Sequence, residues 1–308
     1  MRPAAEFPID AVCLWVDGSD PAWMATAAAA FQEEQRRHPS CGIVHSHLRE
    51  PERVPPFAKD ELYYGCKLVE KHMPWLRTYY LVTAKPQKPW WWKERMGNTR
   101  CVIVHHEDIF DDVSRLPTFN SVTIQTQLSN IPGLAEHFIL FDDDFFVGQP
   151  MKRTDFFTAD GSQAVAHTYP LQPAAMPAGN WRILCENMMA MGKEIMGSGV
   201  QVCVPDHVAM PLFKSLFREI THDISSKRSL VLHKFRSSAD YVPHYVTVML
   251  MLARKKMVPA SARIRTTFLS YYDDVRTSAF PEQAPHMFCL NDRMTEEDVT
   301  YLQRLLLA

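Results

Sequence analysis

The chain has 308 residues, of which 46% are hydrophobic, so it is long enough to bury the core of one large α/β domain. Its 33 Lys and Arg residues against 35 Asp and Glu residues give a formal net charge of -2. This balance argues against a general nucleic-acid-binding surface. Recognition of phosphate groups would therefore have to be local.

The cysteines and the hydropathy of the chain favour a cytoplasmic protein. The 7 cysteines form no CxxC pair, and most lie in apolar runs, where a buried reduced thiol is the common outcome. The stretch from Met1 to Asp10 has no apolar core of signal-peptide length, and no run elsewhere approaches the ~20 apolar residues of a membrane span. We therefore expect a cytoplasmic protein that is not embedded in a membrane.

Strand and helix patterns alternate in residues 1–150. Apolar runs typical of strands occur at Ile9–Val16, Thr78–Thr83, Cys101–Val104 and Phe138–Phe141. Helical spacing lies between them, and it predicts helices over Asp60–His72 and Asn120–Leu128. We predict an α/β fold with its sheet core in this half of the chain.

Residues 151–308 are less regular and more helical. Helices are expected at Pro211–Ile220 and Asp240–Lys255, beyond a Pro-rich segment at Pro170–Pro177. No internal repeat or low-complexity linker separates the two halves. We therefore treat 1–308 as a single domain, in which 151–308 forms a lid over the sheet half.

Acidic residues follow two of the predicted strands. Asp17 and Asp20 follow the first, and Asp142, Asp143 and Asp144 follow the fourth, where open α/β sheets bind their ligands. Consecutive carboxylates repel one another unless a cation neutralises them, and Mg²⁺ or Mn²⁺ prefers carboxylate oxygens. A solvated acidic turn is the simpler alternative, but the apolar flanks of the triplet oppose it. We predict that the triplet binds Mg²⁺ or Mn²⁺ beside a diphosphate.

Ordered motifs along most of the chain resemble the Stealth family of sugar-phosphate transferases. The matching segments are Ile9–Trp23 for the first region, Asp60–Leu62 through Phe141–Asp144 for the second, His207 with Pro211 for the third, His233–Ser237 with Asp240 for the fourth, and Phe288–Asp292 near the C-terminus. Several motifs in this order are far more specific than one acidic turn.

The resemblance implies a nucleotide-sugar-binding, Rossmann-like (GT-A-like) sheet and a UDP-sugar donor with Mg²⁺ or Mn²⁺. It makes 1–308 a single catalytic domain, with 1–150 as the half that binds the nucleotide sugar and the metal and 151–308 as the lid and acceptor half. It implies transfer of hexose 1-phosphate, or N-acetylhexosamine 1-phosphate, to an acceptor hydroxyl with release of UMP. Bacterial members of the family build phosphodiester-linked capsular or surface polysaccharides in this way. The acceptor would be a carbohydrate, free or lipid-linked, and a lipid-linked acceptor would bring the enzyme to the inner face of the membrane.

Roles for single residues also follow from the resemblance and the required chemistry. His207 is the candidate general base, Arg236 is the candidate phosphate clamp, and Asp17 joins the metal cluster. Further candidates for substrate binding are Asp20, Asp60, Asn120, His233 and Asp240. Structural alternatives remain open: Asn120 as a helix cap, Arg236 as a surface partner of Asp240, and His207 as an ordinary structural histidine.

Departures from the family pattern concern the acceptor more than the reaction. Pro56–Lys59 stands where the family often has Arg-Phe-Arg, Asp142 stands where it has Asn, and His207–Pro211 differs from the usual His-Thr-Pro-Tyr-Pro. Two rival functions remain: a metal-dependent glycosyltransferase that releases UDP, and a non-catalytic sugar- or nucleotide-binding protein.

Tryptophans give two further expectations. Trp15 lies in the first apolar run, so we expect it to pack in the core. Trp90–Trp92 follows Pro89, and we expect an exposed patch there for a partner or a membrane-bound acceptor.

Overall fold

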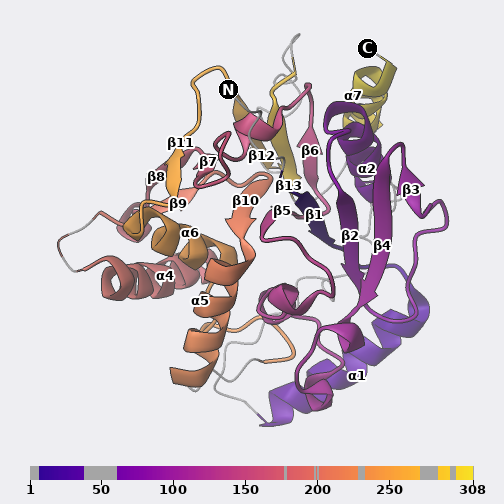
Figure 1. The fold of residues 1–308 in the computed structure, drawn as a ribbon. Coiled ribbons are helices and arrows are strands. Elements are labelled where there is room, and N and C mark those ends of the chain that lie inside the picture. The colour runs from indigo at the N-terminus through magenta and orange to yellow at the C-terminus, as the bar shows by residue number, and fades with distance from the viewer. Residues whose placement is uncertain are drawn as a thin grey trace.

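The computed structural model describes residues 7–37, 61–176, 179–197, 199, 201–227, 233–270, 284–291 and 296–307 (Figure 1). The elements up to residue 150 are β1 (Ile9–Leu14), α1 (Pro21–Arg37), α2 (Glu61–His72), β2 (Thr78–Thr83), β3 (Arg95–Met96), β4 (Thr99–His105), α3 (Ser121–Gln125), β5 (His137–Phe141) and β6 (Phe145–Val147). They are followed by β7 (Ala164–Ala166), β8 (Thr168–Pro170), α4 (Asn180–Met196), β9 (Cys203–Pro205), β10 (Met210–Phe213), α5 (Lys214–Lys227), α6 (Pro243–Ala253), β11 (Met257–Pro259), β12 (Thr266–Ser270), β13 (Met287–Asn291) and α7 (Glu296–Leu307).

The central sheet has six strands in the order β10-β5-β1-β2-β4-β3. Strands β5, β1, β2 and β4 run parallel, while β10 and β3 are antiparallel edge strands. Cys13 of β1 pairs with Phe141 of β5, so the loops that follow these two strands leave the sheet at the same edge. The predicted α/β class is confirmed, and the acidic strand ends lie on neighbouring strands.

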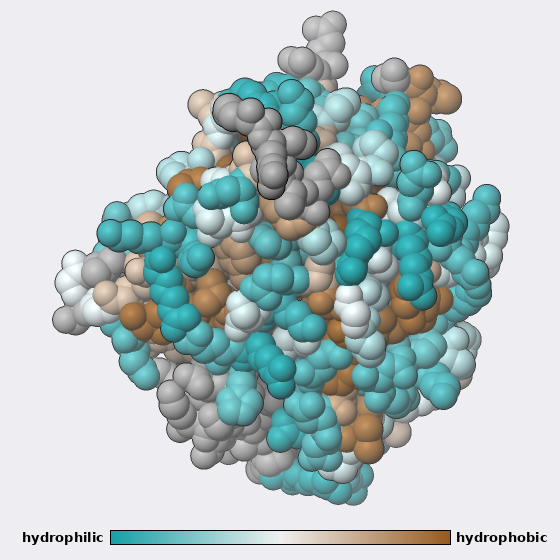
Figure 2. Space-filling model, in the orientation of Figure 1, coloured by the Kyte–Doolittle hydropathy of each residue, from teal (hydrophilic) through white to brown (hydrophobic). Residues whose placement is uncertain are grey.

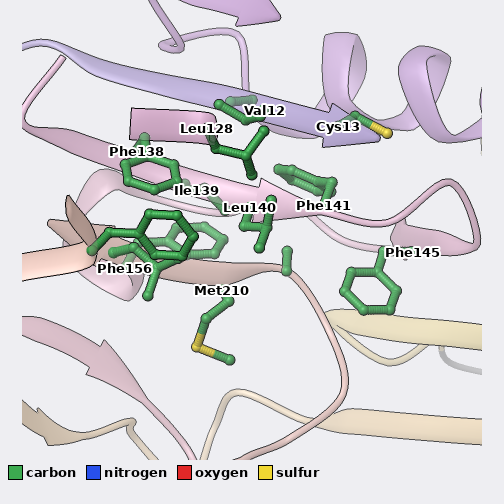
Figure 3. Packing of buried hydrophobic residues seen from close by; sticks show 14 of the residues in the cluster. Val12, Cys13, Leu128, Phe138, Ile139, Leu140, Phe141, Phe145, Phe156 and Met210 are labelled. Atoms are coloured by element: carbon green, nitrogen blue, oxygen red, sulfur yellow. The ribbon is translucent and has the colours of Figure 1, made fainter. Parts of the chain in front are cut away.

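Both halves of the chain share one hydrophobic core. Every residue of β1 and β2 is buried, and α6 is buried along most of its length against α4 and α5. Figure 3 shows Phe138 and Leu140 of β5 beside Phe156 and Met210 from the second half. The predicted functional division between residues 1–150 and 151–308 stays a prediction.

A smaller sheet continues from the acidic loop. Its strands lie in the order β12-β13-β6, and β6 begins directly after Asp144. Phe146 of β6 and Phe288 of β13 stack with ring centroids 5.2 Å apart, within a second cluster to which α2 and α7 contribute. This sheet links the end of β5 to the C-terminal part of the protein.

Two helix predictions need correction, and two helices were missed. Pro211–Phe213 was predicted as helix, but it forms β10, because its apolar side chains extend the sheet beside β5; the helix begins only at Lys214. The helix predicted over Asn120–Leu128 is shorter: α3 ends at Gln125, and a 3-10 turn follows at Leu128–Asn130. Helices α1 and α4 were not predicted.

The predictions for the cysteines and for Trp15 are confirmed, whereas the predicted tryptophan patch is confirmed only in part. The described cysteines are all free, and all but Cys203 are buried, as expected. Trp15 packs against the core, as expected. The predicted tryptophan patch is wrong except at its first residue: Trp90 is 86% exposed, whereas Trp91 and Trp92 pack against the core.

In the described part of the chain, no helix is both long enough and apolar enough to cross a membrane. On the face drawn in Figure 2, hydrophobic residues form separate patches among hydrophilic ones.

Candidate functional site

The acidic loop connects β5 to β6. Phe141 and Phe145, which flank the loop, are buried and lie at its two ends in Figure 3, while the three aspartates between them are half-buried. The Phe145 amide donates to the Asp142 carbonyl at 3.2 Å and closes the turn. The apolar flanks therefore hold the carboxylates at the end of the central sheet.

Burial raises the pKa of each carboxyl in this loop. The pKa of Asp143 rises to about 7, first because of desolvation and then because of the charge of Asp142. The pKa of Asp144 rises well above its usual range through desolvation and both neighbouring aspartates. Desolvation also raises the pKa of Asp142, although the charges of His207 and Arg236 oppose the rise. These carboxylates are costly to ionise together, so a bound cation would relieve a repulsion already present.

The third aspartate is tied to the smaller sheet. The Cys289 thiol donates to Asp144 Oδ2 at 3.3 Å, and the Leu290 amide donates to the Asp144 carbonyl at 3.1 Å. The other carboxylate oxygen, Asp144 Oδ1, is buried and has no hydrogen-bond partner among the described residues. A buried carboxylate oxygen without a partner is a suitable ligand for a hard cation.

His207 lies in the turn between β9 and β10. Its Nδ1 is 3.2 Å from the hydroxyl oxygen of Tyr245, a buried residue of α6. Its ring lies edge-on to Phe145, with centroids 4.9 Å apart, and also contacts Phe268. Burial lowers the pKa of His207, and the Asp142 charge only partly opposes this effect. The imidazole is therefore neutral near pH 7 and can accept a proton.

Arg236 lies on the surface beside α3. Its Nη2 donates to Ser121 Oγ at 2.9 Å. Its charge lowers the pKa values of both Asp142 and His207, so the guanidinium lies within electrostatic range of the acidic loop and the imidazole. Asp240, the alternative partner for Arg236, instead accepts hydrogen bonds from Asn120 and from the Ser237 amide.

Asn120 joins α3 to the segment His233–Asp240, which carries Arg236 and is called the Arg236 segment below. Its side-chain oxygen accepts from the Val122 amide at 3.0 Å, which confirms the structural alternative of a helix cap, while its predicted contact with substrate stays a prediction. Its Nδ2 donates to Asp240 Oδ2 at 3.0 Å and to the Phe235 and His233 carbonyls at 3.2 and 3.4 Å. Asn120 and Asp240 are both buried, so this network fixes the backbone from which Arg236 projects.

His233 lies behind this network. It is buried, and its Nδ1 is 3.4 Å from Oε1 of Glu34, a buried residue of α1. The same carboxylate oxygen accepts from the Lys234 amide at 3.2 Å. These contacts give His233 a structural role, and its predicted contact with substrate stays a prediction.

Asp17 and Asp20 form a separate network at the end of β1. Asp17 Oδ1 accepts from the amide and the hydroxyl of Ser19 at 3.0 and 2.6 Å, as in an Asx-turn. Gln87, in the loop after β2, bonds to the Asp17 backbone and to Asp20 Oδ2. Asp20 Oδ1 also accepts from the Ala22 amide at the start of α1. The predicted roles of Asp17 in the metal cluster and of Asp20 in substrate binding stay predictions.

Asp142, His207 and Arg236, which come from three separate motifs, thus lie within electrostatic range of one another. Asp60 lies outside the described residues.

Sequence reasoning missed three supporting residues: Gln87, Tyr245 and Ser121. Gln87 had a signal, since it follows a predicted strand. Tyr245 had none, because it lies in a helix that is apolar on all sides.

The residues of the acidic loop fit a divalent cation only in part. Across the described ranges, no group of three or more His, Cys, Asp or Glu side chains converges so as to hold a metal ion by itself. Mg²⁺, however, is commonly bound by one or two carboxylates together with substrate phosphates. Asp144 Oδ1 and the neighbouring Asp142 or Asp143 suit that arrangement.

The chain is similar to known proteins over most of its length. Residues 7–30 match the model of Stealth protein CR1, conserved region 1, and residues 57–165 match Stealth protein CR2, conserved region 2. An exopolysaccharide phosphotransferase of Streptomyces coelicolor is 30% identical over 97% of this chain and 49% of its own length. The capsular polysaccharide phosphotransferases fcs1 of Haemophilus influenzae (28% identical) and LcbA of Neisseria meningitidis (29% identical) align with 96% and 95% of this chain, and with 80% of their own lengths.

The chain spans about half the length of the Streptomyces relatives that it matches. The two matched regions contain β1 with Asp17 and β5 with the acidic loop, which are the strand ends that the fold places side by side. The similarity to the phosphotransferases continues beyond them through the turn of His207 and the segment of Arg236. The chain belongs to the Stealth family.

Proposed function

We propose that this protein is a sugar-1-phosphate transferase that moves hexose 1-phosphate, or N-acetylhexosamine 1-phosphate, from a UDP-sugar to a hydroxyl of a carbohydrate acceptor. The observation that carries the proposal is that the His207 ring packs on Phe145 at the end of the acidic loop, within electrostatic range of both Asp142 and Arg236. The names of the relatives, exopolysaccharide and capsular polysaccharide phosphotransferases, support a role in making a surface polysaccharide.

The reaction needs one proton transfer and one displacement at phosphorus. The acceptor oxygen attacks the phosphorus next to the sugar, a new P–O bond forms, and the bond to the bridging oxygen breaks so that UMP leaves. The neutral His207 imidazole takes the proton of the attacking hydroxyl. Arg236 supplies a guanidinium to the phosphate oxygens as negative charge develops on the leaving group.

The tautomer of His207 determines which nitrogen acts. If Nδ1 carries the hydrogen and donates to the Tyr245 hydroxyl, Nε2 is free to accept the proton from the acceptor. Burial raises the pKa of Tyr245 well above its usual range, so the phenol stays neutral beside the imidazole. We infer that Tyr245 orients the base.

We propose that Asp144, with Asp142 or Asp143, binds Mg²⁺ or Mn²⁺. When bound, the cation would neutralise the diphosphate and the leaving phosphate. The buried, unpartnered Asp144 Oδ1 and the raised pKa values in the loop support this assignment. Asp17 is the candidate from the neighbouring strand end.

The type of sheet, the cellular compartment and the location at the membrane belong to the same proposal. The parallel strands β5, β1, β2 and β4 suit a Rossmann-like, GT-A-like sheet that binds the nucleotide beyond its carboxyl edge. A UDP-sugar donor and free buried thiols suit the cytoplasm. A lipid-linked acceptor would place the reaction at the inner face of the membrane.

Product analysis tests the proposal. The protein is incubated with Mg²⁺ or Mn²⁺ and a panel of UDP-sugars, with and without oligosaccharide acceptors, and the nucleotide product is identified by chromatography. UMP together with a phosphodiester in the phosphorus spectrum of the product is the expected result. UDP without a phosphodiester would establish the rival glycosyltransferase. Donor binding without turnover in any mixture would favour the non-catalytic rival.

A further inference from the structure

Three aromatic side chains around His207 are unusually exposed. Phe268 of β12 and Trp181 of α4 are each 48% exposed, and Tyr169 of β8 is 41% exposed. Exposed large rings are costly in water, and these three come from three different elements, of which β12 is far from the other two in the sequence. Their common location therefore needs an explanation.

Each ring is connected to the predicted base by direct or nearby contacts. The Phe268 ring contacts the His207 ring with centroids 5.6 Å apart. The Trp181 ring packs edge-on against Tyr245, 6.3 Å between centroids, and Tyr245 holds His207. Tyr169 pairs with Val204 of β9, and β9 packs against α6, the helix that carries Tyr245.

Hydrogen bonds fix this group of rings relative to His207. Thr266 Oγ1 of β12 donates to Asp206 Oδ2, next to His207 in the sequence. The Asp206 amide donates to the His167 carbonyl at 3.2 Å, and Tyr169 pairs with Val204 in the β8–β9 ladder. Phe268 and Tyr169 are therefore presented by strands that are tied to the turn of the base.

We propose that Trp181, Phe268 and Tyr169 form the acceptor subsite and bind a sugar ring of the carbohydrate acceptor. This inference rests on the proposed function. The C–H face of a pyranose packs well on an aromatic ring. Tyr169 lies in the β8–β9 pair and Asp206 directly follows β9, so a hydroxyl and a carboxylate from this pair are available to sugar hydroxyl groups. A sugar held on these rings presents a hydroxyl to His207, which is the geometry that the transfer requires.

Binding of water-soluble saccharides tests the subsite without turnover. Saturation-transfer NMR is measured for the wild type and for Trp181→Ala and Phe268→Leu, with methyl pyranosides and tetrasaccharides of glucose, N-acetylglucosamine, mannose and galactose at millimolar concentration. Trp90→Ala is the matched control, because Trp90 is an exposed tryptophan outside this group. At least one saccharide should bind the wild type and the control, and each subsite variant should bind it roughly tenfold more weakly.

Activity then separates this inference from the proposed function. In the subsite variants, KM for the acceptor should rise roughly tenfold while KM for the UDP-sugar stays the same. The inference is overturned if no saccharide binds the wild type, or if the subsite variants bind it as well as the wild type does. It is also overturned if Trp90→Ala loses as much binding as Trp181→Ala. Failure to form UMP from any donor would instead overturn the proposed function, whatever the binding result.

Discussion

His207 and Arg236 lie close enough to interact, yet they should fail in different ways when replaced. His207→Ala removes the proton acceptor, so kcat should fall by about a hundred- to ten-thousand-fold while donor affinity stays nearly unchanged. Arg236→Ala should weaken donor binding as well, because the guanidinium is assigned to the phosphates. Single-turnover kinetics and donor titration separate the two effects. Near-normal turnover in a folded His207→Ala protein would return this histidine to a structural role.

Tyr245 should act through His207 and not on the substrate. Tyr245→Phe removes the hydroxyl beside Nδ1 and leaves the ring contacts with Trp181 and His244 in place. We expect kcat to fall by roughly tenfold, the effect of about one hydrogen bond, with unchanged KM for the donor. The ¹⁵N shifts of the His207 ring should show a changed mixture of tautomers. Unchanged shifts together with lost activity would mean that Tyr245 has another role.

Asp143 should make the metal-free protein less stable as pH rises. Its folded-state pKa is raised from 3.8 to about 7, so between these values the folded state retains a proton that the unfolded state has lost. The unfolding free energy therefore falls as pH increases through this window. Asp143→Asn removes the cost, and its Tm relative to the wild type should increase from pH 4 to pH 8 in the presence of a chelator.

Asp112 provides the matched control for this measurement. It is an exposed aspartate whose pKa is lowered by hydrogen bonds from Ser114. Asp112→Asn should therefore gain no stability at any pH. If Asp143→Asn gains none at pH 8 either, the acidic loop carries no repulsion for a cation to relieve.

At the scale of elements, the Arg236 segment and α3 should fold as a unit through Asn120. Asn120→Ala removes a helix cap worth about 1 kcal/mol and leaves the buried Asp240 short of a donor, at a cost of about 1–3 kcal/mol. We expect Tm to fall by several degrees and donor affinity to weaken, because the backbone that carries Arg236 loses its support.

Asn120→Ser separates the two contributions to this loss. Serine keeps a capping oxygen but has no amide to donate to Asp240, so it should recover only the cap, roughly 1 kcal/mol of the lost stability. Calorimetric melting and donor titration measure both quantities. Equal stability of the Ala variant and the wild type would contradict the network.

Elements were predicted accurately where the hydrophobic pattern and the turn-forming residues at its ends agree. Thr78–Thr83 was predicted with the bounds that the structure gives, since an apolar run lies between polar and turn-forming residues. Pro211–Phe213 was misread because its apolar residues suit a helix or a buried strand equally well, and only its pairing with β5 decides between them. Helix α1 was missed because its apolar residues are mostly alanines, which give a weak amphipathic pattern.

The candidate site shows the same limit. The acidic loop and His207 could be recognised because they lie within motifs of sequence. Their supports could not: Tyr245 reaches His207 across 38 positions, and Cys289 reaches Asp144 across 145. Such pairs arise from how α6 and β13 pack, which local patterns do not encode.

At the scale of the whole molecule, the parallel strand ends, the smaller sheet and the His207 turn all meet at the acidic loop. Asp142–Asp144 follows β5, Cys289 of β13 contacts Asp144, and Phe145 contacts His207. A ligand that neutralises this loop should therefore stabilise parts of the protein that are distant in sequence. A metal and a donor diphosphate should stabilise the protein together. The diphosphate and the loop carboxylates are both negatively charged, so the cation is needed between them.

We therefore expect cooperative stabilisation by the donor and the divalent cation. UDP-glucose or UDP-N-acetylglucosamine should raise Tm only with Mg²⁺ or Mn²⁺ present, and a ligand at a hundred times its Kd adds about 2.7 kcal/mol to the unfolding free energy. The cation alone should raise Tm much less, because the loop carboxyls hold protons that compete with it. Asp144→Asn should abolish the joint effect, whereas Trp90→Ala should keep it. Equal stabilisation by the donor in excess chelator would show that the diphosphate is bound by Arg236 and neighbouring groups without a metal, and the acidic loop would then lose its assigned role.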